Sequence, residues 1–399
     1  MPRLRAELPS RSYEVVVGRG ALARVGGLLA RLRAPAAAVV CCDENVAPLY
    51  LDAVRGSLGA AGFAVSQIVV PAGERQKTLE RAAEMYGVLY DRGLRRRDVV
   101  VALGGGVVGD LAGYVAATYL RGVGLVQVPT TLLAQVDAAV GGKVAVDFRA
   151  GKNYVGTFYQ PLLVVADPDV LATLPARELR SGMAEVVKYG LLSGGELLRR
   201  VERAVGRWRA GAAATADREG SGTAALADAE GAGKTDTAVR AGGPEALAVA
   251  LTGRLIADCV AVKLAVVAGD EREESGARAV LNLGHTVGHA VEAATGFGRY
   301  THGEAVAFGL RAALWLSQRL CALPAADVGR GLRLLEAAGL PTRLEHATPA
   351  SVCELTARDK KAGGEGVEFV LLEALGRPRL RVRVPAALLE EVVTWLGAP

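Results

Sequence analysis

Three of the four histidines in the chain fall between positions 285 and 302. His285 and His289 are four residues apart in LNLGHTVGHA and would share one face of a helix, and His302 opens HGEAVAFG. On another predicted helix, Glu185 lies three residues before Lys188. One Glu and two His beside an open position are typical of a catalytic zinc site. The spacing favours His285 and His289 as the metal pair. It also allows His285 with His302, which would leave His289 for proton or phosphate chemistry.

A glycine-rich turn forms the second candidate site. In LGGGVVGD, Gly104, Gly106 and Gly109 fit the pattern G-x-G-x-x-G between a predicted strand (98–103) and a predicted helix. Glycines let the backbone approach a pyrophosphate, and the helix N-terminus supplies N–H donors. The segment therefore predicts a nucleotide site, the alternative being a tight turn without a ligand. In an ordinary dinucleotide-binding domain this turn belongs to the first strand–helix unit, whereas here it lies near position 100.

Polar residues among small ones form the third candidate site, in VPTTLLAQVDAAVGGKVAVDFRAGKN. Loops beyond the carboxyl ends of parallel strands are where α/β sheets bind ligands. Lysine and asparagine there suit an anionic, hydroxylated substrate, and the alternative is a solvated loop. The candidate residues are Thr130, Thr131, Asp137, Lys143, Lys152 and Asn153.

The elements that must position these residues change in character along the chain. Up to about residue 177, short apolar runs alternate with helical stretches, which predicts a Rossmann-like α/β domain (1–177) with a parallel sheet. The remainder (178–399) is predicted to be a mostly α-helical domain for metal and substrate. Its expected helices are 180–209, 245–268, 279–295, 303–321 and 325–339, with a short strand pair within 367–384.

One segment of the second part stands apart in composition. Residues 210–233 contain 15 Ala or Gly among 24, and Leu226 is their only large apolar side chain. Such a stretch buries too little apolar surface to offset the entropy lost on ordering. We therefore expect residues 206–244 to be a disordered or loosely helical surface insertion.

The composition limits the possible partners. The chain is 51% hydrophobic, enough for a large core, and its formal charge of +5 is small for 399 residues. This favours an anionic small molecule over nucleic acid as the ligand. No apolar run reaches the roughly 18–20 residues of a membrane span, and the N-terminus has no signal-peptide core. We therefore expect a cytoplasmic protein without membrane contact.

Five segments in this order resemble the 3-dehydroquinate synthase family of sugar-phosphate cyclases. The resemblance runs from about residue 10 to 390 and lapses only across the Ala/Gly-rich insertion. The segments are GGGVVGDLAGYVAATYLRG, VQVPTTLLAQVDAAVGGKVAVDFRAGKNYVGTFYQP, SGMAEVVKYGLL, LNLGHTVGHAVEA and HGEAVAFG.

The resemblance implies an NAD-dependent lyase of the shikimate pathway, which leads to aromatic amino acids. It would need one divalent metal, zinc or cobalt, and act as a homodimer. Such an enzyme converts 3-deoxy-D-arabino-heptulosonate 7-phosphate to 3-dehydroquinate and phosphate. The reaction would begin with transient oxidation by NAD, followed by phosphate elimination, re-reduction and an intramolecular aldol step. The re-reduction regenerates NAD.

The resemblance also implies residue roles. The metal ligands would be Glu185, His285 and His302, which departs from the pair favoured by spacing. Phosphate would be held by Lys143, Asn153, Asn282, His289 and Lys360. Lys263 and Arg278 would meet the carboxylate or nearby hydroxyls, Asp137 and Lys188 would order the metal's surroundings, and Arg121 would reach the neighbouring subunit. The implied NAD positions are Asp43, Glu74, Lys77, Gly105, Gly106, Asp110, Thr130, Thr131, Asp137, Lys143, Lys152, Thr173 and Leu174.

Three other functions compete with this interpretation. A sister cyclase acting on another sugar phosphate or an amino analogue is the nearest rival, because function depends on site details and not on the fold. A polyol dehydrogenase such as glycerol dehydrogenase shares the glycine-rich turn and a His cluster, but would carry Asp at the position of Glu185. A non-enzymatic binding protein would not need every ligand position filled. The stretch DEREESGAR (270–278) is one residue longer than expected, which affects the role assigned to Arg278.

Overall fold

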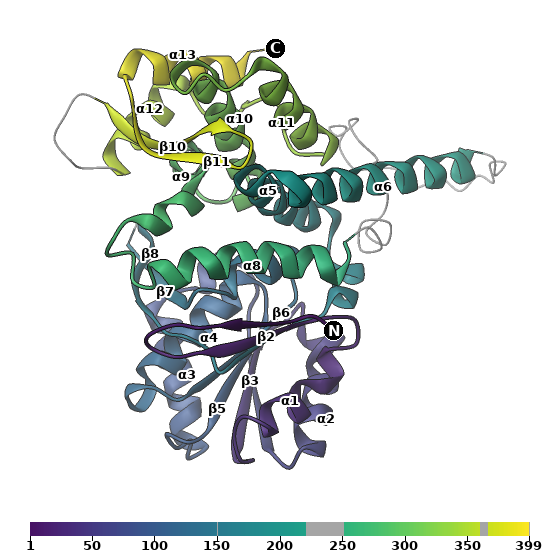
Figure 1. Ribbon diagram of the computed structural model, residues 1–399. Coiled ribbons are helices and arrows are strands. Elements are labelled where there is room, and N and C mark those ends of the chain that lie inside the picture. Colours follow the sequence, from purple (N-terminus) through teal and green to yellow (C-terminus); the bar gives the residue numbers. More distant parts are fainter. Residues whose placement is uncertain (150, 221–250, 360–365, 399) are drawn as a thin grey trace, which may run out of the picture.

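A seven-stranded sheet forms the N-terminal part of the computed structural model, which describes residues 1–149, 151–220, 251–359 and 366–398 (Figure 1). The sheet order is β1-β2-β9-β6-β5-β3-β4, and all neighbours are parallel except the β1–β2 hairpin. Every residue of β5, β6 and β9 is buried, as expected for strands covered on both faces. The strands are β1 (Arg3–Ala6), β2 (Tyr13–Val17), β3 (Ala37–Asp43), β4 (Ala64–Val70), β5 (Val99–Gly104), β6 (Gly124–Pro129) and β9 (Leu163–Ala166).

Helices cover both faces of this sheet. Side chains of β5 alternate between the two faces, so that Val99 and Val101 pack with α1 (Val25–Ala30) and α2 (Asp52–Ala60). Val100 packs on the other face with α3 (Leu79–Asp91) and α4 (Gly106–Thr118). The predicted α/β class with a Rossmann-like parallel sheet is confirmed.

The strand order explains the late position of the glycine-rich turn. β3 lies between β4 and β5, so the chain proceeds first to one side of β3 and then to the other. Ligands of open α/β sheets bind where the order reverses, at the carboxyl ends of the two central strands. Here these ends are Asp43 on β3 and Gly104 on β5, which places the turn at 104–106 at the reversal point.

The rest of the chain is mainly helical. α8 crosses between the sheet and the other C-terminal helices (Figure 1). The predicted strand pair is confirmed as β10 (Val367–Ala374) and β11 (Arg377–Val384). The helices are α5 (Ala176–Ser193), α6 (Gly195–Gly220), α8 (Gly253–Gly269), α9 (His285–Ala294), α10 (His302–Leu320), α11 (Ala325–Ala337), α12 (Pro349–Asp359) and α13 (Ala386–Gly397). Helices α12 and α13 were not predicted.

Two predicted helices are each split by a glycine. The stretch 180–209 divides between α5 and α6 at Gly194, which has φ +59° and contacts the β10–β11 turn. The stretch 279–295 divides into the 3-10 turn η7 (Ala277–Asn282) and α9, with Gly284 at φ +82° between them. Glycine adopts a positive φ at little cost, so both breaks are local consequences of sequence.

The apolar core around α5 also takes in sheet residues. Val15 and Val17 of β2 and Val164 of β9 belong to the same cluster as Met183 and Val187 of α5. The sheet and the helices therefore share one core at this point. The division into domains at residues 177 and 178 stays a prediction.

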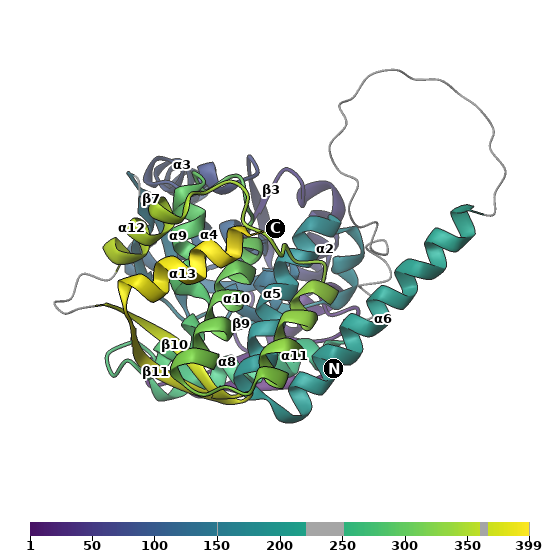
Figure 2. The ribbon, with the colours of Figure 1, turned by 90° about the horizontal axis from the view of Figure 1, so that it is seen from above.

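The predicted insertion is wrong at its beginning. Helix α6 continues to Gly220, and Trp208 is 2% exposed within the main core. Val205 and Trp208 are three residues apart, so they extend the apolar stripe of α6 beyond residue 206. The far end of α6 projects beyond the other elements (Figure 2). Residues 221–244 lie outside the described part of the chain.

A second hairpin, β7 (Lys143–Phe148) with β8 (Gly151–Phe158), lies on the side of the sheet that faces α9 (Figure 1). It carries several of the predicted polar residues. Among the helices that the structure describes, none is both long and apolar enough to span a membrane.

Replacing Trp208 by Ala tests whether the first residues of the predicted insertion belong to the core. We expect the free energy of unfolding to fall by about 3–5 kcal/mol, because the indole is buried. Urea unfolding of Trp208→Ala and of the neighbouring exposed control Arg209→Ala would measure it. Equal stability of the two variants would show that α6 does not pack beyond residue 206.

Candidate functional site

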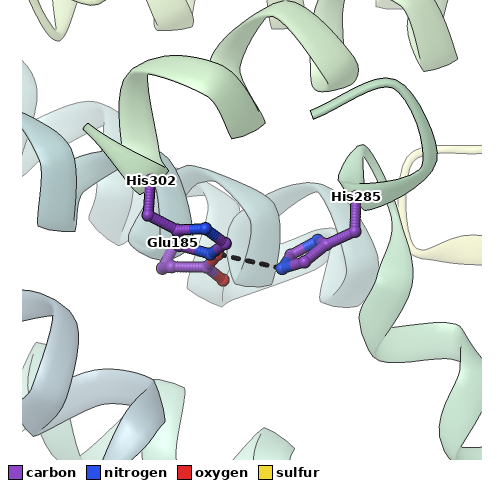
Figure 3. A group of neighbouring side chains, drawn as sticks. All are labelled: Glu185, His285 and His302. Atoms are coloured by element: carbon purple, nitrogen blue, oxygen red, sulfur yellow. Dashed lines mark ion pairs between the residues drawn. The ribbon is translucent and has the colours of Figure 1, made fainter. Parts of the chain in front are cut away.

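Three side chains converge where α5, α9 and α10 meet. Glu185 comes from the middle of α5, while His285 and His302 are the first residues of α9 and α10. Nε2 of His285 lies 3.4 Å from Oε1 of Glu185, and Nε2 of His302 lies 3.6 Å from the same oxygen (Figure 3). The ligand atoms of all three lie within 4.8 Å of one another. The structure thus brings together the set that the resemblance implied, and His289 is not in it.

The other ring nitrogens of the two histidines are held by the protein. Nδ1 of His285 lies 3.2 Å from the carbonyl oxygen of Leu283, and Nδ1 of His302 lies 3.1 Å from Oε2 of Glu292. A proton on each Nδ1 satisfies these contacts, so that each Nε2 faces Glu185 and becomes a metal ligand when it carries no proton. This is the arrangement that surrounds metal-ligating histidines.

The Glu185 carboxylate supplies the test of whether a metal fits. It is 1% exposed, and within the described residues its Oε1 accepts no well-aligned hydrogen bond. Its Oε2 lies 2.5 Å from Nζ of Lys188. An unsatisfied carboxylate oxygen is costly to bury, and a cation beside Oε1 would remove that cost. One oxygen and two nitrogen donors fit zinc or cobalt.

Charges around the site set the protonation of its members. Burial raises the pKa of Glu185, but the Lys188 ammonium and then His285 outweigh it and lower the value to about 2. Burial, followed by Lys188, lowers the pKa of His285 to about 3. Burial also lowers the pKa of His302, yet the nearby carboxylates of Glu185 and Glu292 raise it to about 9. At neutral pH, Glu185 is therefore an anion, His285 is neutral, and His302 carries a proton on Nε2 that a bound metal would displace.

Close backbone packing fixes the first turn of α10. A Cβ added to Gly303 would lie 1.9 Å from the carbonyl oxygen of Ser181 on α5. Before it, Thr301 and Glu304 form a capping box, in which each side chain accepts a hydrogen bond from the other residue's backbone N–H. His302 is thus held between the capping residue Thr301 and Gly303, whose close contact with α5 no larger residue could make.

A second buried charge cluster lies beside the first. Asp137, from the π-helical turn η5 (Ala134–Ala138), has its Oδ2 3.0 Å from Nζ of Lys263 and its Oδ1 3.8 Å from Nζ of Lys188. The hydroxyl of Tyr189 donates to Oδ1. Burial opposes the charge, but Lys263 and then Lys188 hold the pKa of Asp137 far below its ordinary value. Through Asp137, the ion pair Glu185–Lys188 is linked to the turn that follows β6 of the sheet.

Family models match most of the chain. The model described as 3-dehydroquinate synthase N-terminal covers residues 67–181, and that described as 3-dehydroquinate synthase C-terminal covers 182–362. The chain belongs to the 3-dehydroquinate synthase family. The 3-dehydroquinate synthase of Desulforamulus reducens is 42% identical over 94% of this chain and 95% of the relative. That of Symbiobacterium thermophilum is 45% identical over 92% of each.

Solved structures of sugar-phosphate cyclases have the same architecture. A 2-deoxy-scyllo-inosose synthase complexed with carbaglucose-6-phosphate, NAD+ and Co2+ has a TM-score of 0.81 and 26% identity, covering 98% of this chain and 99% of its own. A 2-epi-5-epi-valiolone synthase from Streptomyces hygroscopicus with NAD+ and Zn2+ has a TM-score of 0.78, 27% identity and 98% coverage of both. A probable glycerol dehydrogenase from Sinorhizobium meliloti, with 18% identity, a TM-score of 0.59 and coverage of 96% and 95%, shares the fold alone.

Among the NAD positions implied by membership of the 3-dehydroquinate synthase family, four charged residues form one network. Lys77, 2% exposed, lies 3.1 Å from Asp110 and 3.0 Å from Glu74, and Lys152 lies 3.6 Å from Glu74. At the glycine-rich turn, a Cβ on Gly105 would come within 3.0 Å of Thr131.

The remaining implied NAD positions make local contacts. Asp43 accepts hydrogen bonds from the backbone N–H groups of Asn45 and Val46, and Thr130 donates its backbone N–H to Gly104. Thr173 contacts the hydroxyl of Tyr50, and Leu174 is partly buried against the main core. Gly106 opens α4, as a turn directed at a pyrophosphate requires.

Four of the five residues predicted to hold phosphate are exposed. These are Lys143 and Asn153 on the β7–β8 hairpin, Asn282 at the end of η7, and His289 on α9. In the structure Lys143 pairs with Glu273, 2.5 Å away. Lys360 lies outside the described residues.

Arg278 and Arg121 make no contact with the Glu185, His285 and His302 group in the part of the chain that the structure describes. Arg278 is 2% exposed and donates to the carbonyl oxygens of Glu271 and Gly141. Its predicted contact with a carboxylate stays a prediction, as does that of Lys263, which is bound to Asp137. Arg121 ends the 3-10 turn η4 (Tyr119–Arg121) between α4 and β6, so it lies near the amino ends of the strands, whereas the glycine-rich turn lies at their carboxyl ends. The structure does not bring it to the site of its own chain.

Two carboxylates of the site were missed in the sequence. Glu292 contacts both His302 and Lys152, and Glu273 contacts both Lys143 and Arg278. Glu292 lies three residues after His289 on the same helix, and this spacing was a usable signal. Glu273 lies in an irregular loop with φ +60°, and no periodicity marks such a position.

Replacing Asp137 by Asn tests the buried charge cluster in the metal-free protein. We expect a loss of about 3–5 kcal/mol in the free energy of unfolding at pH 7, because two ammonium groups lose their shared anion. The folded-state pKa of Asp137 is below the unfolded value, so its stabilisation is full above about pH 4 and fades below it. Urea unfolding at pH 7, 5 and 3.5 would show the difference from the wild type shrinking only at the lowest pH. The control Asp52→Asn removes a carboxylate that is 97% exposed and should change little. A difference that persists undiminished at pH 3.5 would contradict the assigned pKa direction.

Proposed function

We propose that the chain catalyses the conversion of 3-deoxy-D-arabino-heptulosonate 7-phosphate to 3-dehydroquinate and phosphate. The observation that carries the proposal is the convergence of Glu185, His285 and His302, in a chain that is 41–45% identical to curated 3-dehydroquinate synthases over nearly its whole length. Sugar-phosphate cyclases of known structure support the use of a nicotinamide cofactor and a divalent metal.

Glu185, His285 and His302 would hold the metal. When bound, it supplies Lewis-acid polarisation of substrate hydroxyl groups. The protein's own part is to keep Glu185 ionised and to orient the two imidazoles. Lys188 holds Glu185 ionised, and the carbonyl of Leu283 and the carboxylate of Glu292 hold the two imidazoles by Nδ1.

The carboxyl ends of β3 and β5 would hold NAD, which supplies a reversible acceptor for one hydride. The backbone N–H groups at the start of α4 would face the pyrophosphate of NAD, and Gly105 allows Thr131 to pack closely against the turn. Lys77 and Lys152, both paired with Glu74, supply positive charge on the same side.

Lys143, Asn153, Asn282 and His289 would bind the substrate phosphate at the exposed edge of the site. A phosphate there competes with Glu273 for Lys143, so the loop that carries Glu273 has to yield. Asp137 holds Lys188 and Lys263 in place beneath the substrate hydroxyls.

A homodimer in the cytoplasm completes the proposal. The position of Arg121 on the far side of its own sheet suits a contribution to a neighbouring subunit. The sister cyclases remain the second candidate function, because 2-deoxy-scyllo-inosose synthase and 2-epi-5-epi-valiolone synthase have the same architecture.

An assay of the purified protein with the heptulosonate phosphate, catalytic NAD and zinc tests the reaction. We expect phosphate and dehydroquinate to appear in equal amounts without accumulation of NADH, since NAD is regenerated in each turnover. Turnover only with other sugar phosphates would assign a sister cyclase. Steady NADH accumulation would identify a dehydrogenase and refute the proposal.

Replacing His285 by Ala tests the metal site separately. We expect the variant to lose both stoichiometric metal and turnover, since one of three ligands is removed. Metal content would be measured by elemental analysis after gel filtration, with His346→Ala as a control distant in sequence from the three ligands. A normal metal content in His285→Ala would overturn the ligand assignment.

A further inference from the structure

Glu292 occupies a position between the two halves of the site. It lies on α9, its side chain is 4% exposed, and each of its carboxylate oxygens has its own partner. Oε2 lies 3.1 Å from Nδ1 of His302, and Oε1 lies 3.1 Å from Nζ of Lys152 on β8. One buried carboxylate thus joins a metal-ligand candidate on α10 to the hairpin on the sheet side.

Lys152 extends this connection towards the sheet. Its Nζ lies 3.6 Å from Glu74, which pairs with Lys77 at 3.0 Å, and Lys77 pairs with Asp110 of α4 at 3.1 Å. Contacts of alternating charge therefore run without a gap from α4 to His302. Glu292 is the only member of this series on α9, so it is the point at which the series crosses to the helical side.

Glu292 is better suited to orient a ligand than to be one. His289, Glu292 and His302 also have ligand atoms within 4.8 Å of one another, so a metal site on that side has to be considered. Both oxygens of Glu292 are hydrogen-bonded, whereas Oε1 of Glu185 is buried without a well-aligned donor among the described residues. The unsatisfied oxygen therefore favours the metal beside Glu185 and leaves Glu292 behind His302.

We propose that Glu292 is a positioning residue, which fixes the ring of His302 through Nδ1 so that Nε2 faces the metal, and which is itself held by Lys152. This inference rests on the proposed metal site of Glu185, His285 and His302. A carboxylate behind a ligating histidine selects the tautomer, orients the ring and increases the basicity of the ligating nitrogen. Lys152 keeps the carboxylate in this place from outside the helical layer.

The proposal is tested by metal affinity, which does not require turnover. Zinc and cobalt dissociation constants of the full-length metal-free protein would be measured by competition with a chromophoric chelator. We expect Glu292→Ala to weaken binding about 10–100-fold, the usual effect of removing such a partner. As a control, Glu202→Gln removes the carboxylate that pairs with Arg330 and should leave the zinc and cobalt dissociation constants unchanged.

Two conservative variants separate positioning from simple charge. Glu292→Gln loses the negative charge but keeps an oxygen that can accept from Nδ1 of His302. Glu292→Asp keeps the charge but is shorter by one bond of about 1.5 Å, so the contact is lost. If Glu292 acts by positioning, Glu292→Gln retains a higher metal affinity than Glu292→Asp. The visible spectrum of the cobalt form is then altered in Glu292→Asp and Glu292→Ala but close to that of the wild type in Glu292→Gln. The reverse order would mean that only the charge matters and would overturn the proposal.

Two histidine variants identify which metal group is real. If the metal lies beside Glu185, His285→Ala abolishes binding while His289→Ala weakens it at most several-fold. The opposite result would make Glu292 a ligand and refute its positioning role. Thermal unfolding of each metal-free variant controls for loss of fold. If Glu292→Ala does not fold, the comparison of Glu292→Gln with Glu292→Asp takes its place. Wild-type metal binding without turnover of the heptulosonate phosphate would refute the proposed function alone.

Discussion

The buried ion pair between Glu185 and Lys188 is the constraint around which the site is built. Both side chains are almost fully buried, and their charged atoms lie 2.5 Å apart in the middle of an apolar helix. Buried ions are costly unless their remaining donors and acceptors are also satisfied. Asp137 meets this need for Lys188, while His285 and His302 face the remaining oxygen of Glu185. Elements far apart in the sequence are therefore drawn to one point by the need to compensate charge.

The same constraint links the sheet to the helical part. Asp137 comes from a turn after β6, and Lys263 from α8, the helix that crosses between the two layers (Figure 1). Their pairing at 3.0 Å fixes α8 against the end of the sheet. The helical part, with Glu185, and the sheet part, with the glycine-rich turn, are thus held together by buried charges at Asp137 and again at Glu292.

Much of the fold was predictable because it depends on local periodicity. The alternation of buried strands with amphipathic helices specified a parallel sheet, and the glycine-rich turn specified a strand–helix junction at Gly105. The candidate metal-binding residues were harder to predict from the sequence. His285 and His289 have helical spacing, but the break at Gly284 makes His285 the first residue of α9, so that it faces Glu185 while His289 is exposed. The choice of His302 came from resemblance, because the partner that selects it lies on α5.

Contacts that depend on tertiary structure were missed altogether. Glu292 matters because Lys152, 140 residues earlier, reaches it from a hairpin, and no rule of spacing connects the two. Trp208 belongs to the core because α6 packs over most of its first four turns, whereas composition alone suggested an unpacked insertion from residue 206. In each case the sequence contained the side chain but not the neighbour that gives it a role.

The strand order has a consequence for how the chain is made. β2 ends at Val17, and its parallel partner β9 begins only at Leu163. At a synthesis rate of about 5–20 residues per second, β9 follows β2 by about 7–30 s. During this interval β3 to β6 can already pair with one another, while the N-terminal hairpin waits with an unpaired apolar edge. In the order of synthesis, β9 is the last strand to join this sheet, immediately before α5 and its Glu185 carboxylate, so the N-terminal hairpin is among the last parts of the sheet to be secured.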